Sequence, residues 1–114
     1  MEDKRQAARA SKFIPVMIED SKVNMLFRAN IGDLSYDGMR VMVTQFLPKG
    51  TQYMFSLKFT PPIKVKGEVR WISSMGTDSF RVGIHFLEMT PQSEEMIRKI
   101  VDHELNKKQH HSAI

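Results

Sequence analysis

The sequence predicts an all-β domain with one helix: a six-stranded antiparallel β-barrel, or a strongly curled sheet, followed by a C-terminal α-helix. The first observation is a series of six short runs in which apolar and polar residues alternate, the period of half-buried strands. The second is a single segment with helical periodicity near the C-terminus. The third is the length of 114 residues, which suits one domain with a modest core.

The first two alternating runs, residues 13–18 and 23–31, predict a β-hairpin across a four-residue polar turn. Each run has its apolar residues on one face, and a slip by one residue would bury the polar face instead. Pairing apolar with apolar places Ile18 opposite Val23. Pro15 falls on the other face of the first run, where it indicates an edge or a bulge.

The later strands are separated by turns rich in Pro, Gly and Ser, and the last three register as a meander. The four predicted strands are residues 39–46, 53–59, 63–72 and 80–86. In the meander, Gly67 falls between Phe55 and Ile84, so we expect that a side chain at this position would crowd the core.

A helix is expected from Thr90, because Thr is a favoured N-cap and Pro91 fits the first helical position. Its apolar residues recur at helical spacing and form one stripe: Met96, Ile97, Ile100, Val101 and Leu105. The expected organisation is one domain: a mobile basic arm over residues 1–12, a barrel over 13–89, the helix over 90–108 and a tail over 109–114.

Composition excludes several classes of protein. The chain has no cysteine, so it has no disulfide framework and no thiolate metal site. Met1 is followed by two acidic residues rather than a basic and then apolar segment, which argues against a signal peptide and for the cytoplasm. No apolar run approaches the length of a membrane span. The net charge of +4, with basic residues crowded near the N-terminus, suits an anionic partner.

The sequence does not predict an enzyme. It has no metal-ligand cluster, no Gly-rich phosphate loop and no nucleophile beside a base, so we expect neither a metal nor a cofactor. His85 and His103 have no partners at ligand spacing, and both are interpreted as structural.

The polar stretch Asp33-Leu34-Ser35-Tyr36-Asp37-Gly38 lies between two predicted strands and is the strongest candidate for a binding site. It supplies a carboxylate at Asp33, a hydroxyl at Ser35, and a glycine at Gly38 where the chain can turn at positive φ. The densest basic segment of the chain precedes it, with Arg5 and Arg9. Guanine suits this pair of segments, because carboxylate and hydroxyl oxygens accept from its N1–H and N2–H₂ groups while an Arg fork donates to O6 and N7.

The predicted hairpin brings these two segments together. Extending its ladder toward the N-terminus places Ala8 opposite Asp33, at one end of the sheet. Arg5 and Arg9 are distant from Asp33 in sequence but are expected to be its neighbours in space, as a joint ligand site requires.

Arg5-x-x-x-Arg9 followed by Asp33-x-Ser35-x-x-Gly38 resembles the two-part signature of PilZ domains, bacterial receptors for the second messenger cyclic di-GMP. PilZ domains are six-stranded barrels with a C-terminal helix, so the resemblance agrees with the fold derived from periodicity. It implies cyclic di-GMP binding by Arg5, Arg9, Asp33, Ser35 and Gly38, and a signal passed to an unidentified protein partner.

Two further residues are weaker candidates. Lys4 stands beside Arg5 where the family often has another Arg, but a Lys cannot make the same fork. Trp71 shares the parity of core residue Val69, which favours burial, yet it lies near the end of its strand, where an aromatic of some relatives approaches the nucleotide. Asp37 is interpreted as a turn residue.

Two other functions remain open from the sequence. One is a PilZ-like adaptor that binds proteins without a nucleotide. The other is a small barrel that binds RNA or single-stranded DNA, whose mark is aromatic residues on the outward face among basic ones. Here the aromatics of the basic strands have inward parity, so no nucleic-acid partner is expected.

Overall fold

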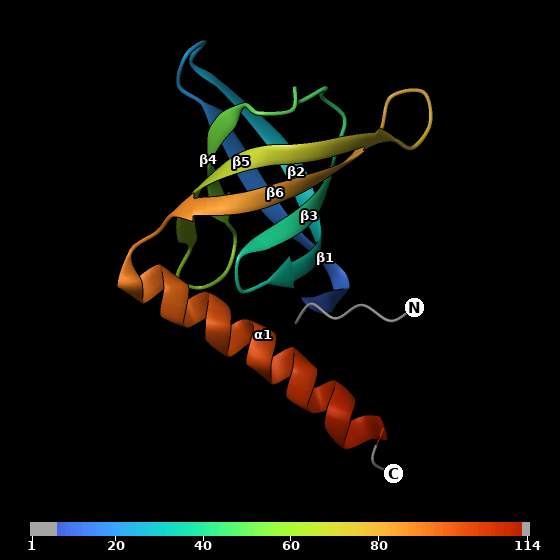
Figure 1. Cartoon of the computed structure of the whole chain (residues 1–114), viewed down its shortest axis with the longest axis vertical. Helices are drawn as coiled ribbons and strands as arrows, with labels where there is room; N and C mark the ends of the chain where they lie inside the picture. The colour runs from blue at the N-terminus through green and yellow to red at the C-terminus, as the bar shows by residue number, and fades with distance from the viewer. Residues whose placement is uncertain (1–6, 113–114) are drawn as a thin grey trace.

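A computed structural model of the chain describes residues 7–112 and shows a closed barrel of six antiparallel strands with one helix outside it (Figure 1). The predicted fold is therefore confirmed. The elements are β1 (Ala7–Asp20), β2 (Met25–Ser35), β3 (Gly38–Val43), β4 (Gln52–Leu57), β5 (Ile63–Ser74), β6 (Phe80–Glu88) and α1 (Pro91–Ser112). Their order around the barrel is β1-β2-β3-β6-β5-β4, with β4 closing onto β1. Within residues 7–112, no helix is long and apolar enough to cross a membrane.

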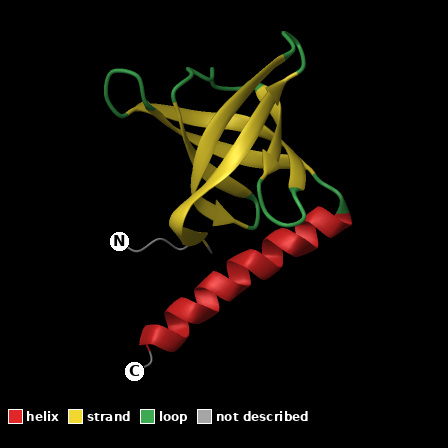
Figure 2. Cartoon of the chain, turned by 180° about the vertical axis from the view of Figure 1, so that it is seen from behind, coloured by secondary structure: helices red, strands yellow, loops and turns green. Residues whose placement is uncertain are grey.

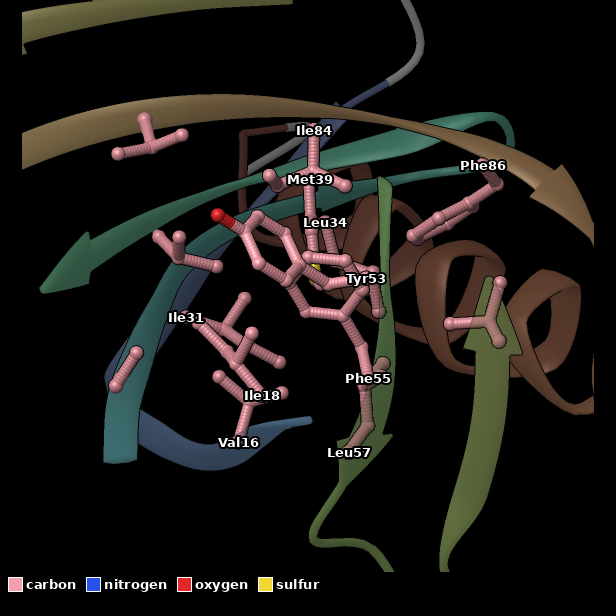
Figure 3. Close-up of a cluster of buried hydrophobic side chains, with 14 of the residues drawn as sticks. Val16, Ile18, Ile31, Leu34, Met39, Tyr53, Phe55, Leu57, Ile84 and Phe86 are labelled. Atoms are coloured by element: carbon pink, nitrogen blue, oxygen red, sulfur yellow. The ribbon is translucent and has the colours of Figure 1, made fainter. Parts of the chain in front are cut away.

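The core fills the barrel with aliphatic and aromatic side chains from alternate strand positions (Figure 3). Ile18, Phe55 and Leu57 are completely buried. Tyr53 packs edge-on against Phe55, with 6.3 Å between ring centroids. Because inward positions are apolar along every strand, the polar residues of the candidate site are left on the outer surface.

The first hairpin confirms the predicted faces but not the predicted register. Ile18 pairs with Phe27 instead of Val23, a shift of four residues that preserves parity. The turn occupies residues 21–24, with Asn24 in the left-handed region at φ 57° and Val23 57% exposed. Val23 is thus a turn residue, although its apolar side chain suggested the start of a strand.

Strand β1 begins at Ala7, so residues 7–12 belong to the sheet and not to the arm that the sequence predicted. Ala7, Ala8 and Arg9 pair with the end of β2, and the register then shifts before Ile14. Residues 1–6 lie outside the described residues.

Among the register shifts of the sheet, two β-bulges reverse the alternation of side chains beside the candidate site. In β2, Ile31 pairs with Val41 but Asp33 pairs with Arg40, so Gly32 is an extra residue. In β5, Val69 pairs with Ile84 but Trp71 pairs with Gly83, which makes Arg70 the extra residue. A bulge turns the following side chain to the other face of the sheet.

Gly67 is crowded as the sequence predicted, although its register differs by two residues from the expected one. A Cβ at this position would lie 2.6 Å from Ile84 Cγ2 and 3.0 Å from Phe55 Cε1. The absence of a side chain at Gly67 leaves the space that Ile84 and Phe55 occupy on either side of it.

Helix α1 lies across one end of the barrel and packs against β1, β2 and β5 (Figures 1 and 2). The Thr90 hydroxyl caps it by accepting from the Ser93 N–H at 3.1 Å. Ile97 and Val101 are completely buried against the barrel. The helix reaches Ser112, four residues beyond its predicted end at 108, and its C-terminal half extends away from the strands.

Candidate ligand-binding site

A pocket of about 300 Å³ opens on the outer surface of β2, β3, β5 and β6. This volume lies at the lower end of the range of about 300–1,000 Å³ for small-molecule sites. The pocket is lined by Asp33, Ser35, Asp37, Gly38, Met39, Arg40, Arg70, Trp71, Gly83, Ile84 and His85. It therefore brings together three of the five predicted binding residues and the weaker candidate Trp71.

Asp33 reaches the outer surface because of the bulge at Gly32. Without the extra residue, Asp33 would share the inward parity of Ile31, which is completely buried. The Asp33 carboxylate forms a salt bridge with Arg40, directly across on β3, and its side chain is 16% exposed. The bulge thus converts a core position into one that presents a carboxylate to the pocket.

Ser35 and Gly38 form the two ends of the short connection between β2 and β3. The Ser35 hydroxyl lies 3.0 Å from the Gly38 carbonyl oxygen, to which it donates, and 3.2 Å from Asp37 Oδ1. The Asp37 carbonyl accepts from the Phe86 N–H at 2.9 Å. These bonds hold the connection against β6 and leave the lone pairs of Ser35 Oγ available to a ligand donor.

Gly38 is required for a different reason from the one the sequence suggested. The described glycines with positive φ are Gly50 and Gly76, so Gly38 does not serve a left-handed turn. A Cβ at Gly38 would instead overlap the backbone carbonyl of Ile84 on β6. Close approach of β3 to β6 is the constraint, and it fixes the position of the whole connection.

Trp71 faces outward, contrary to the core position that its parity favoured. The bulge at Arg70 moves it to the outer face, where 39% of the residue is exposed. Its indole lies on Gly83, where a Cβ would overlap the ring atoms Nε1 and Cε2. A glycine on β6 thus provides the space for an aromatic ring beside Asp33 and Ser35.

The N-terminal part of the predicted site is described only in part. The backbone register places Arg9 directly opposite Asp33, one residue from the predicted pairing of Ala8 with Asp33. The expectation that β1 brings Arg9 to the end of β2 is therefore confirmed. Arg5 and Lys4 lie outside the described residues.

Tyr36 links the β2–β3 connection to helix α1. Its hydroxyl donates to Asp102 Oδ1, and the Arg98 guanidinium lies 4.8 Å from the centre of its ring. The hydrogen bond to Asp102, with smaller contributions from burial and the carboxylate charge, raises the pKa of Tyr36 above 10.0, and the Arg98 charge opposes this shift. The connection is therefore held from two sides, by β6 and by α1.

Four polar or charged residues that line the pocket were not assigned to the site from the sequence: Asp37, Arg40, Arg70 and His85. Arg40 was predictable, because a two-residue connection pairs Ser35 with Gly38 and hence Asp33 with Arg40. His85, interpreted as structural, is half-buried opposite Gly38. Arg70 is the extra residue of the β5 bulge, and its Nε lies 4.0 Å from Glu68 Oε1. In the described part of the chain, no group of three or more His, Cys, Asp or Glu could hold a metal ion.

The family model of the PilZ domain matches residues 3–103. A comparison with curated protein sequences found no match.

Several solved structures share the fold. The PilZ domain with c-di-GMP of YcgR from Escherichia coli has a TM-score of 0.73 and 14% identity, over 99% of this chain and 98% of that chain. Longer E. coli YcgR, in complex with c-di-GMP, has a TM-score of 0.76 and 17% identity, over 99% of this chain and 50% of that chain. K. pneumonia MrkH in its apo state has a TM-score of 0.81 and 16% identity, over 97% and 55%. The chain thus spans about half the length of these two longer proteins.

Proposed function

The chain belongs to the PilZ domain family, and on that premise we propose that it is a receptor for cyclic di-GMP that acts by binding and not by catalysis. The observation that carries the proposal is the convergence of Asp33, Ser35 and Trp71 on one pocket, with Arg9 opposite Asp33 in the backbone register. Two similar structures contain the same nucleotide, which supports this choice of ligand.

The chemistry of the pocket fits one guanine of the ligand. The Asp33 carboxylate and the Ser35 hydroxyl accept from N1–H and N2–H₂, the pair of donors that distinguishes guanine from adenine on this edge. The exposed face of Trp71 gives the base a surface for stacking. The second guanine and the two phosphates extend beyond this pocket toward the N-terminal segment.

Arg5 and Arg9 bind the phosphates and the guanine acceptor atoms of the ligand. A guanidinium donates two parallel hydrogen bonds to a phosphate, or to guanine O6 and N7. Two arginines separated by three residues would therefore contact different parts of a ligand that has two phosphates and two bases.

Strand β1 begins at Ala7, so the N-terminal arm comprises residues 1–6. In our proposal the ligand also orders this arm. With the arm folded over the bound nucleotide, the protein presents a new surface made of ligand, arm and the neighbouring strands. A partner protein that recognises this surface would receive the signal. The domain then needs no catalytic residue to transmit it.

Calorimetric titration with cyclic di-GMP tests the proposal and also gives the stoichiometry. We expect specific binding, with GMP and cyclic GMP far weaker because neither presents two guanines and two phosphates to one site. Equal competition by these mononucleotides would exclude the assignment.

The same titration with Arg5→Ala and Arg9→Ala tests the N-terminal half of the site. Loss of one charge-assisted hydrogen bond costs about 1.5–3 kcal/mol, or roughly ten- to a hundred-fold in affinity. The control is Arg28→Ala, which removes a positive charge from an exposed position of β2 that does not line the pocket. Wild-type affinity in either arginine variant would exclude this half of the site.

A further inference from the structure

Arg40 forms a salt bridge with Asp33, although it is not part of the two-part signature. The β2–β3 connection and the bulge at Gly32 together make Arg40 the direct cross-strand neighbour of Asp33. Its guanidinium Nη2 bonds Asp33 Oδ2, and both side chains line the pocket. On its other side, Arg40 pairs with Gly83, the residue that supports Trp71.

The salt bridge matters because guanine recognition depends on the orientation of the carboxylate. N1–H and N2–H₂ point in parallel, so both carboxylate oxygens must lie in the plane of the base. A carboxylate has about four lone-pair sites, and guanine uses two of them. One bond from Arg40 can therefore persist in the complex and fix the plane of the Asp33 carboxylate before the base arrives.

We propose that Arg40 is a positioning residue of the ligand site: it holds the Asp33 carboxylate in the orientation that accepts both donors of a guanine. This inference rests on the proposed function and assigns a residue outside the signature to guanine selectivity. Arg40 acts through Asp33, so its effect is confined to the edge of the base that Asp33 contacts.

Cyclic di-IMP is the probe that separates a positioning role of Arg40 from a role as a positive charge alone. This ligand is cyclic di-GMP without the two 2-amino groups. Both ligands carry the same phosphates, so a general loss of positive charge weakens both by the same factor. The ratio of their affinities reports the hydrogen bond from the 2-amino group. Calorimetric titration of each ligand against wild type and variants measures this ratio.

In Arg40→Ala we expect the ratio of the cyclic di-GMP affinity to the cyclic di-IMP affinity to fall by about threefold or more. It should approach the ratio measured in Asp33→Ala, because the accepting carboxylate is no longer held in its orientation. Arg40→Lys keeps a charge but not the planar fork, so its ratio should lie between wild type and Arg40→Ala. In Asp33→Ala, adding Arg40→Ala should leave the ratio unchanged, because the residue through which it acts is gone.

Arg28→Ala is the matched control and should keep the wild-type ratio. If Arg40→Ala weakens both ligands equally, Arg40 serves only as a charge and the inference is overturned. The same holds if Arg28→Ala lowers the ratio as much as Arg40→Ala does. Failure of wild type to bind cyclic di-GMP would instead overturn the proposed function itself, so the two failures are distinguishable.

Discussion

Asp33 illustrates how one residue combines a structural partner with a proposed ligand contact. Its carboxylate is bonded to Arg40 on β3 and lines the pocket beside Ser35. Asp33→Ala should weaken cyclic di-GMP binding by roughly ten- to a hundred-fold, the equivalent of about 1.5–3 kcal/mol for a charge-assisted hydrogen bond. Asp33→Asn should be milder, because the amide oxygen still accepts one hydrogen bond. Titration calorimetry on both variants checks the order, and an Asn variant weaker than the Ala variant would contradict the acceptor argument.

Gly38 offers a test of the site that is independent of any ligand. A methyl group at this position would overlap the carbonyl of Ile84, which is backbone and cannot move aside as a side chain can. Gly38→Ala should therefore lower the free energy of unfolding by about 1–3 kcal/mol, as overpacking does. Urea denaturation followed by circular dichroism measures the change.

Gly32→Ala is the control for this prediction, since it adds the same methyl group to the same hairpin. Its Cβ would lie 3.3 Å from the flexible end of Met42 and at an ordinary contact distance of 3.9 Å from the Arg40 carbonyl oxygen. We expect its stability to stay closer to wild type than that of Gly38→Ala. Equal losses in the two variants would show that close approach to β6 is not the constraint at Gly38.

Helix α1 and the β2–β3 connection are joined through Tyr36. The contribution of this link to the stability of the folded protein should depend on pH. Tyr36→Phe keeps the ring under Arg98 but removes the hydrogen bond to Asp102. At neutral pH the variant should melt at a lower temperature than wild type. Thermal unfolding followed by circular dichroism measures the difference.

The direction of the pH effect follows from the raised pKa of Tyr36. A group whose pKa is higher in the folded protein contributes its full stability below the unfolded value of 10.0, and this contribution disappears as pH rises through the folded value. The melting difference between wild type and Tyr36→Phe should thus be constant from neutral pH to about pH 10 and shrink above it. Tyr53 also has a raised pKa, mainly from burial, but it is present in both proteins and cancels in the comparison. A difference that persists undiminished would contradict this account.

The elements show where sequence patterns suffice and where they do not. Alternation predicted six strands, and it predicted the inner faces of their regular parts correctly, because an apolar interior selects parity wherever the pairing of strands is regular. It could not predict the bulges at Gly32 and Arg70, since a single extra residue depends on how neighbouring strands pair. Both bulges lie in the site, which explains why Trp71 appeared to be a core residue and is exposed instead.

Turns limited the prediction in a related way. Val23 has the side chain of a strand residue, and the four-residue error in the first hairpin arose there. Asn24, which tolerates positive φ, was the available signal for the true turn. The site was still predicted in part, because Asp33, Ser35 and Gly38 are close in sequence. To place Arg9 near them, it was enough to predict that its segment pairs with the end of β2.

On the scale of the whole molecule, the first residues of β1 pair with the end of β2 that carries Asp33 and Ser35, and the connection that follows β2 is bonded to α1 through Tyr36. We expect residues 1–6 to be mobile without ligand and ordered with it, because the segment has few large apolar side chains to offset an ordering entropy of about 1–2 kcal/mol per residue. The ligand supplies fixed partners for Arg5 and Arg9. Backbone amide relaxation by NMR, with and without cyclic di-GMP, measures this ordering. A segment rigid in the free protein, or still mobile at saturation, would exclude the mechanism.

Trp71 is the single tryptophan among the 114 residues, and it lies on the wall of the proposed site. Fluorescence excited at wavelengths that tyrosine does not absorb therefore originates from one place in the molecule. The indole is partly exposed, so its emission responds to whatever replaces the water on its outer face. The fold thus gives the protein an intrinsic optical reporter, and ligand arrival can be followed in real time without attaching a dye.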